Sequence, residues 1–168
     1  MERLWSPWRS KYIGTFKNEL TAGENDCFFC CAIESNSISL DTLIVYIAEH
    51  SFVIMNKYPY NNGHLLIAPK RHIGSLNDLV EAELNEISKL QVLSTNVLEI
   101  IYKPHGFNIG ANLGRAAGAG VPDHIHYHVI PRWNGDTNFM PIVSETKILS
   151  QSLEDSFNLI SEGFRALI

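Results

Sequence analysis

Short apolar runs separated by turn residues characterise the first half of the chain. Two short runs rich in β-branched and aromatic residues cover residues 42–48 and 51–56, and a third apolar run follows at 64–69. The segment YPYNNG at residues 58–63, between the last two runs, has the composition of a turn. Runs of this length and composition are typical of strands, and a short turn joins its two strands antiparallel. The pattern therefore predicts a three-stranded antiparallel meander.

From Ser75 onward, apolar residues recur at steps of three and four, which is typical of an amphipathic helix. Its apolar positions are Leu76, Leu79, Val80, Leu84, Ile87, Leu90, Val97 and Ile101. Ser75 is a suitable N-cap, with Asp78 three residues further on, and Pro104 marks the end. We therefore expect one long helix over this stretch.

The second half of the chain adds two strands and a closing helix. The strands are expected at residues 106–112 and 124–131, on either side of the glycine-rich loop LGRAAGAGVPD. The helix begins near Ser150 and carries Leu153, Phe157, Ile160, Phe164 and Leu167 on one face. Five strands and two main helices, segregated along the chain rather than alternating, predict an α+β fold with an antiparallel sheet.

Length, composition and charge narrow the class of protein. With 168 residues and 45% hydrophobic content, the chain can bury a sizeable core, and we expect an irregular N-terminal arm (1–26) followed by a single domain (27–168). The formal net charge of -5 argues against broad binding to nucleic acid, which needs a basic surface. No apolar run is long enough to span a membrane, and the N-terminus lacks the apolar core of a secretory signal, so a cytoplasmic location is expected.

The segment HIHYHVIP places three histidines, His124, His126 and His128, at every second position. On a strand these side chains project to one face, while Ile125 and Tyr127 take the other. Buried imidazoles need partners for their ring nitrogens. A metal site, a phosphate-handling site and an unusual polar core all fit this spacing.

The same segment matches the pattern His-φ-His-φ-His-φ-φ, where φ is apolar, and so resembles the histidine triad (HIT) superfamily of nucleotidyl hydrolases and transferases. The resemblance covers roughly residues 27–143 and implies a HIT-like fold. Within the superfamily, four segments look most like a bacterial branch similar to diadenosine tetraphosphate phosphorylases: YPYNNGHL, HGFNIGANLG, AGAGVPDHIHYH and PRWNGDTNFMP.

The resemblance implies a covalent mechanism on a dinucleoside polyphosphate. The middle histidine, His126, would attack the α-phosphorus and form an adenylyl-histidine, and a backbone carbonyl could fix its tautomer. His128 and His64 would contact phosphate oxygens or the leaving group. Inorganic phosphate as acceptor makes the protein a phosphorylase, and water makes it a hydrolase. Two alternatives stay open: a nucleoside phosphoramidate or aminoacyl adenylate as substrate, or a non-catalytic, zinc-stabilised nucleotide-binding module.

The resemblance also suggests where substrate binds. Asn56 corresponds to the residue that holds ribose hydroxyls, and Asn112 to one that contacts phosphate or ribose. Gly118 and Gly120 allow main-chain N–H groups to approach the phosphates. Trp133 could stack on a base or fill space at the sheet edge. Many relatives carry Ser or Thr three or four residues before the first triad histidine, where this chain has Val121 and Gly120, so backbone amides would have to serve instead.

Three cysteines sit together in the segment CFFCC, and the pair Cys27 and Cys30 has a spacing that suits tetrahedral Zn²⁺. In zinc-binding HIT relatives the same pair is joined by the histidines that correspond to His72 and His124. With four protein ligands the metal would be structural rather than catalytic. Buried free thiols and a redox pair are the competing interpretations, while Cys31 and His50 are rival ligands.

The superfamily is typically dimeric, with the long helix and a sheet edge buried, so we expect a homodimer. The N-terminal arm contains Trp5, Trp8 and Tyr12, which could anchor it against the body of the protein or against the partner subunit.

Overall fold

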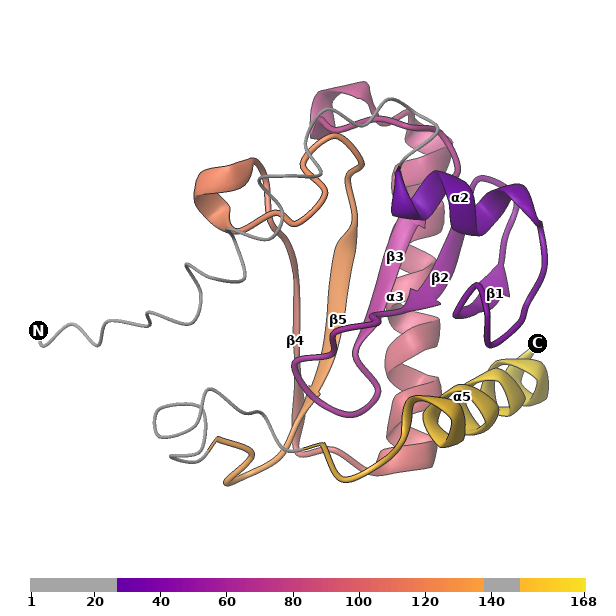
Figure 1. The fold of residues 1–168 in the computed structure, drawn as a ribbon, viewed down its shortest axis with the longest axis vertical. Helices are drawn as coiled ribbons and strands as arrows, with labels where there is room; N and C mark the ends of the chain where they lie inside the picture. The colour runs from indigo at the N-terminus through magenta and orange to yellow at the C-terminus, as the bar shows by residue number, and fades with distance from the viewer. Residues whose placement is uncertain (1–26, 138–148) are drawn as a thin grey trace, which may run out of the picture.

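A computed structural model of the protein describes residues 27–137 and 149–168, so the predicted N-terminal arm with Trp5, Trp8 and Tyr12 lies outside the described residues. The described chain forms one five-stranded sheet in the order β1-β2-β3-β5-β4, with every neighbouring pair antiparallel (Figure 1). The strands are β1 (Ile44–Ile47), β2 (Ser51–Met55), β3 (Leu65–Pro69), β4 (Gly106–Ala111) and β5 (Tyr127–Arg132). The predicted meander and the α+β class are both confirmed.

In the described parts of the chain, three α-helices accompany the sheet: α2 (Phe28–Glu34), α3 (Glu81–Tyr102) and α5 (Leu153–Leu167). The long helix α3 packs against β2, β3 and β5, and α5 packs against α3 and β1. Figure 1 shows α3 running behind the sheet and α2 crossing in front of it. Within the described residues, no helix combines the length and the apolar character that crossing a bilayer requires.

The predicted long helix is interrupted at its start. Ser75 caps a single 3-10 turn, Leu76–Asp78, by accepting a hydrogen bond from the Asn77 N–H. The α-helix begins only at Glu81, where the Glu83 carboxylate accepts a bond from the Val80 N–H and satisfies one of the free donors at the helix start. At the other end Lys103 adopts a left-handed conformation, which ends the helix just before Pro104.

Helix α2 was not predicted. Four of its seven residues are Phe or Cys, which are moderate helix formers, and only Phe29 and Ala32 are buried, so periodicity gave little signal. Tertiary contacts stabilise it instead, because the Phe29 ring packs against the rings of Phe52, His124 and His126. The last strand also starts later than expected, at Tyr127, so His124 and His126 belong to the segment that leads into β5.

The turn between β2 and β3 comes close to α3 at Gly63. This glycine has a φ of +73°, and a Cβ there would lie 2.8 Å from the Tyr102 ring and 2.9 Å from Leu98. A glycine is needed because other residues would meet both backbone strain and this contact. The close approach sets the position of His64, the next residue.

Candidate active site and metal centre

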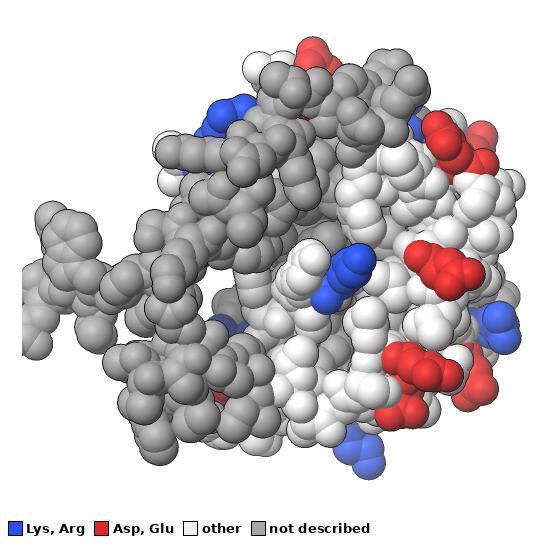
Figure 2. All heavy atoms as spheres, in the orientation of Figure 1, with Lys and Arg blue, Asp and Glu red and all other residues white. Residues whose placement is uncertain are grey.

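A cavity of about 260 Å³ opens on the sheet face that carries His128, and His126 lines it as well. It lies between α2, the β2–β3 turn, the glycine-rich loop and β5. The described residues that line it are Phe28, Phe29, Asn56, Lys57, Tyr58, Tyr60, Leu66, Gly118, Gly120, Val121, His126 and His128. Of these, Lys57 alone carries a permanent charge. Figure 2 shows this side of the molecule, where a basic side chain lies near the centre among uncharged residues and acidic side chains gather toward the right.

Strand pairing explains why His64 and His128 meet. Leu66 of β3 is paired with His128 of β5, so their side chains share one face of the sheet. His64 precedes Leu66 by two residues and therefore projects to the same face. The two imidazoles are joined by a hydrogen bond of 2.9 Å between His64 Nε2 and His128 Nδ1.

The hydrogen-bond partners determine which ring nitrogens carry protons. The Tyr60 backbone N–H, which can only donate, lies 3.0 Å from His64 Nδ1 and so requires a lone pair there. Neutral His64 then carries its proton on Nε2 and donates to His128 Nδ1, which places the proton of neutral His128 on Nε2. That Nε2 is buried, has no hydrogen-bond partner among the described residues, and belongs to a residue that lines the cavity.

His126 has the opposite tautomer. Its Nδ1 donates to the carbonyl oxygen of His124 at 2.9 Å, so its Nε2 keeps a free lone pair. Burial, above all, lowers the pKa of His126, and it lowers the pKa of His64 to about 3 and of His128 to about 4. All three imidazoles are therefore neutral at pH 7, and the site presents a bare nitrogen beside an N–H donor.

The predicted substrate-binding residues divide into two groups. Asn56, Gly118 and Gly120 line the cavity. Asn112 and Trp133 are not among its lining residues: the Asn112 amide lies 3.5 Å from the Gly118 carbonyl, and the Trp133 ring meets Tyr102 of α3 edge-on. Their contact with substrate stays a prediction.

Sequence reasoning missed the aromatic residues and the lysine around the cavity. Phe28 and Phe29 come from α2, while Lys57, Tyr58 and Tyr60 come from the β2–β3 turn. The FF between the first two cysteines and the YPY of the turn were visible in the sequence, but only the fold shows that both segments face the histidines.

A Cys₂His₂ cluster lies beside the cavity. Cys27, Cys30, His72 and His124 each offer one ligand atom, and these atoms all lie within 4.8 Å of one another. His124 Nδ1 is 3.3 Å from Cys27 Sγ and 3.6 Å from Cys30 Sγ, and His72 Nδ1 is 3.2 Å from Cys30 Sγ. Tetrahedral zinc with the usual bond lengths separates sulfur and nitrogen ligands by about 3.6 Å. The donor set therefore fits a metal ion.

The surroundings of the cluster also suit a metal. His124 Nε2 is 2.9 Å from the Pro69 carbonyl, which leaves Nδ1 unprotonated and facing the sulfur atoms. Gly74 brings the His72 segment close to the chain before His124, because a Cβ at Gly74 would lie 2.8 Å from the Pro122 carbonyl oxygen. Cys31 and His50, the rival ligands, are not part of the cluster.

The redox interpretation needs one correction. Cys27 is the N-cap of α2, a helix that the sequence did not predict, so the pair opens a helix as redox pairs usually do. The parallel β-α-β unit that usually accompanies a redox pair is not present in the described chain, whose sheet is antiparallel throughout.

Comparisons with known proteins agree with this geometry. Residues 38–135 match the model of the HIT domain family. The chain is 34% identical over 163 residues to the AP-4-A phosphorylase of Mycobacterium tuberculosis, which covers 96% of this chain and 83% of that protein. It is 33% identical over 93 residues to the asymmetrical bis(5'-nucleosyl)-tetraphosphatase of Schizosaccharomyces pombe, covering 55% of this chain and 50% of the other.

Among solved structures, a Zn-bound histidine triad family protein from Mycobacterium smegmatis superimposes with a TM-score of 0.68. The two chains are 25% identical, and the match covers 86% of this chain and 97% of that one. The fold and the site thus define an α+β protein of the nucleotidyltransferase and hydrolase class, with a histidine-lined pocket. The chain belongs to the HIT domain family.

Proposed function

We propose that this protein transfers nucleotidyl groups from dinucleoside polyphosphates and that it is a diadenosine tetraphosphate phosphorylase. The observation that carries the proposal is the His126 tautomer, because the bond from Nδ1 to the His124 carbonyl leaves a bare Nε2 in a residue that lines the cavity. The similarity to the phosphorylase of Mycobacterium tuberculosis over most of both chains supports the substrate and the acceptor.

In the first step, His126 Nε2 attacks the α-phosphorus of diadenosine tetraphosphate. A P–N bond forms, the bond between the α-phosphorus and the bridging oxygen breaks, and ATP leaves. In the second step, an oxygen of inorganic phosphate attacks the same phosphorus, the P–N bond breaks, and ADP is released.

The other residues stabilise charge and position the substrate. His128 donates from Nε2 to a phosphoryl oxygen or to the leaving group, and His64 holds His128 in that tautomer. The backbone of Gly118 and Gly120 and the ammonium of Lys57 contact phosphates. Asn56, Asn112 and Trp133 bind ribose, phosphate and base.

Structural zinc and a homodimer complete the proposal. Cys27, Cys30, His72 and His124 would hold the ion with no open position, and thiolate ligands suit a reducing compartment such as the cytoplasm. β4 is an edge strand, and among the exposed apolar side chains are Ile109 on β4 and, on α3, Val92 (62% exposed) and Ile100 (63% exposed). A second copy that pairs edge to edge would cover such a strand and helix face.

Product analysis tests the function. Incubation with diadenosine tetraphosphate should give ADP plus ATP only when phosphate is present. AMP plus ATP without phosphate would make the protein a hydrolase, as the similarity to the tetraphosphatase would allow. His126→Ala should abolish turnover. Equal rates for wild type and variant, or no turnover of any dinucleotide, would instead favour the non-catalytic binding module.

A further inference from the structure

Side-chain hydrogen bonds connect the turn that precedes β3 to the C-terminal end of β5. The Asn61 side chain, 9% exposed, donates both to the Pro131 carbonyl at 3.1 Å and to Asp136 Oδ2 at 2.7 Å. These partners lie 70 and 75 residues further along the chain. The amide therefore ties the β2–β3 turn to the segment that follows β5.

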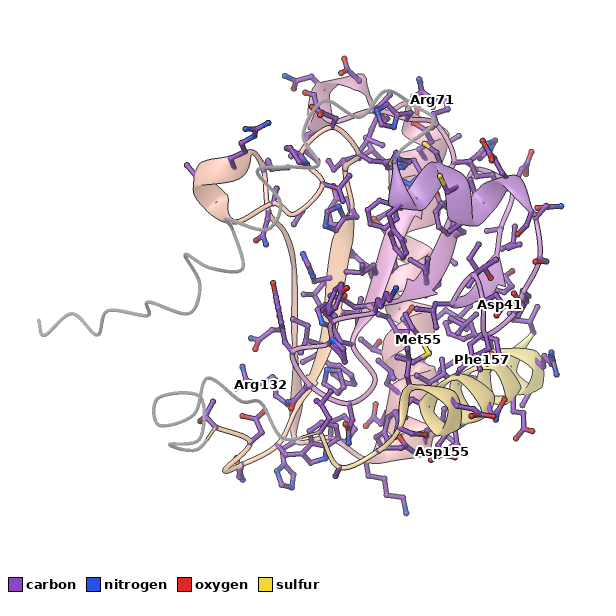
Figure 3. The ribbon with its side chains drawn as sticks, in the orientation of Figure 1. Asp41, Met55, Arg71, Arg132, Asp155 and Phe157 are labelled. Carbon is purple, nitrogen blue, oxygen red and sulfur yellow. The ribbon has the colours of Figure 1, made fainter. Side chains whose placement is uncertain are left out.

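Asp136 is itself held rigidly. Arg132, labelled at the lower end of β5 in Figure 3, donates to both of its carboxylate oxygens, from Nε at 2.6 Å and from Nη2 at 2.8 Å. The Trp133 N–H donates to Asp136 Oδ2 as well, at 3.2 Å. A bidentate ion pair has a defined geometry, so the carboxylate presents a fixed acceptor to Asn61.

The position of this turn influences which ring nitrogen of His64 carries the proton. Asn61 adjoins Tyr60, whose N–H donates to His64 Nδ1, and the Asn61 carbonyl accepts a bond from the His64 N–H at 3.2 Å. If the turn shifts, the Tyr60 N–H leaves Nδ1, which keeps only the longer contact of 3.3 Å to the Asn56 amide, and that nitrogen can then take the proton. His64 Nε2 then becomes an acceptor, His128 must donate from Nδ1, and the buried His128 Nε2 keeps a lone pair, which cannot donate to a phosphate oxygen.

We propose that Asn61 and Asp136 are positioning residues that keep the His64–His128 pair in the tautomer with an N–H donor facing the pocket. Neither residue lines the cavity, and both act on His64 through the backbone of the β2–β3 turn, which carries the Tyr60 N–H and the Asn61 carbonyl. The effect of Asn61 and Asp136 on the histidine tautomers does not depend on which reaction the protein catalyses. Their effect on the reaction rate rests on the proposed function.

The matched variants are Asn61→Ala and Asn62→Ala. Asn61→Ala removes both bonds to the β5 end. Asn62, the next residue and of the same type, makes its side-chain bond to Ser150 instead, so Asn62→Ala controls for disturbance of the turn. Asp136→Asn keeps an acceptor oxygen for Asn61 but removes the charge that Arg132 clamps, so it provides a milder second test should Asn61→Ala fail to fold.

The direct readout is the ¹⁵N–¹H correlation spectrum of the histidine rings in the folded protein without substrate, which distinguishes the two tautomers. Wild type and Asn62→Ala should show the Nε2–H form for His64 and His128. Asn61→Ala should show a mixture containing the Nδ1–H form, and Asp136→Asn a smaller shift in the same direction. His126 should keep its Nδ1–H form in all four proteins.

Kinetics provide the second readout. Asn61→Ala should lower kcat by about 10- to 100-fold, because a misoriented or wrongly protonated imidazole loses its transition-state contact, with little change in KM. Unchanged tautomers in Asn61→Ala, or an Nδ1–H form of His64 in wild type, would overturn the proposal whatever the rates. Failure of the wild type to turn over any dinucleotide would refute the proposed function, while the spectra would still decide the role of Asn61.

Discussion

Acidification should destabilise the fold through the buried histidine pair, and His64 allows the effect to be measured. His64 is 1% exposed, and its Nδ1 accepts the Tyr60 N–H, so protonation breaks that bond inside the protein. Burial, followed by the charges of His128 and His126, lowers the pKa of His64 from 6.5 to about 3. The folded protein therefore resists a proton that the unfolded chain accepts.

This difference in pKa between the folded and unfolded states sets the sign and the size of the pH dependence of stability. Because the pKa of His64 is lower in the folded state, His64 does not disfavour folding above pH 6.5. As the pH falls from 6.5 toward 3, the unfolded chain takes up the proton first, so the free energy of unfolding falls. Within that window each pH unit costs about 1.4 kcal/mol per histidine, so His64 accounts for about 3 kcal/mol between pH 6.5 and 4.5. The pKa of His128, lowered to about 4, adds a similar amount over the same range. Total stabilities of small domains are only about 5–15 kcal/mol.

Urea unfolding followed by circular dichroism at pH 7.5, 6.5, 5.5 and 4.5 measures the effect, with His64→Gln as the matched variant. The glutamine amide can still donate to His128 but does not titrate. Protonation of the metal-cluster histidines affects both proteins and cancels in the difference between them. The wild type should lose its stability advantage below pH 6.5, by about 1.4 kcal/mol per pH unit. A difference between the two proteins that is independent of pH would refute the reasoning.

Two further predictions concern the metal centre. Cys30→Ser should reduce bound zinc from about one ion per chain to near zero by atomic absorption, and should lower the melting temperature, because metal binding to the folded state stabilises it; full zinc content in this variant would exclude Cys30 as a ligand. Gly74→Ala should cost about 1–3 kcal/mol in urea unfolding and weaken zinc binding, because the added Cβ would lie 2.8 Å from the Pro122 carbonyl oxygen. Unchanged stability would show that the two segments separate easily.

Periodicity predicted the fold well where burial repeats regularly along the chain. α3 and α5 each bury one face, and β2 and β3 are buried along their whole length, so their patterns reflect tertiary position. Periodicity did not indicate α2, because a seven-residue helix that is mostly Phe and Cys has neither a clear hydrophobic period nor a strong helix propensity. Its existence depends on the fit of Phe29 against residues far away in sequence.

Residue types and the family resemblance indicated which side chains would meet at the site, but not how their protons are arranged. His64, His126 and His128 were all recognised from sequence. Their tautomers depend on the Tyr60 N–H and the His124 carbonyl. These are main-chain groups that nearly every residue type carries, so residue identity alone does not predict such contacts. The hydrogen bonds from Asn61 to Pro131 and Asp136 could not be predicted from the sequence either, because contacts between residues so far apart in the chain form only when the strands pair.

The alternating histidines divide their tasks by atom as well as by residue. The His124 ring turns its Nδ1 toward the cysteine sulfur atoms, while its main-chain carbonyl accepts a hydrogen bond from the His126 Nδ1–H. One residue thus takes part in both the metal cluster and the proposed nucleophile's environment. A bound metal would hold the His124 ring through Nδ1, the atom that faces the cysteine sulfur atoms. The close spacing of the triad therefore places the metal cluster and the group that determines the tautomer of His126 on the same residue.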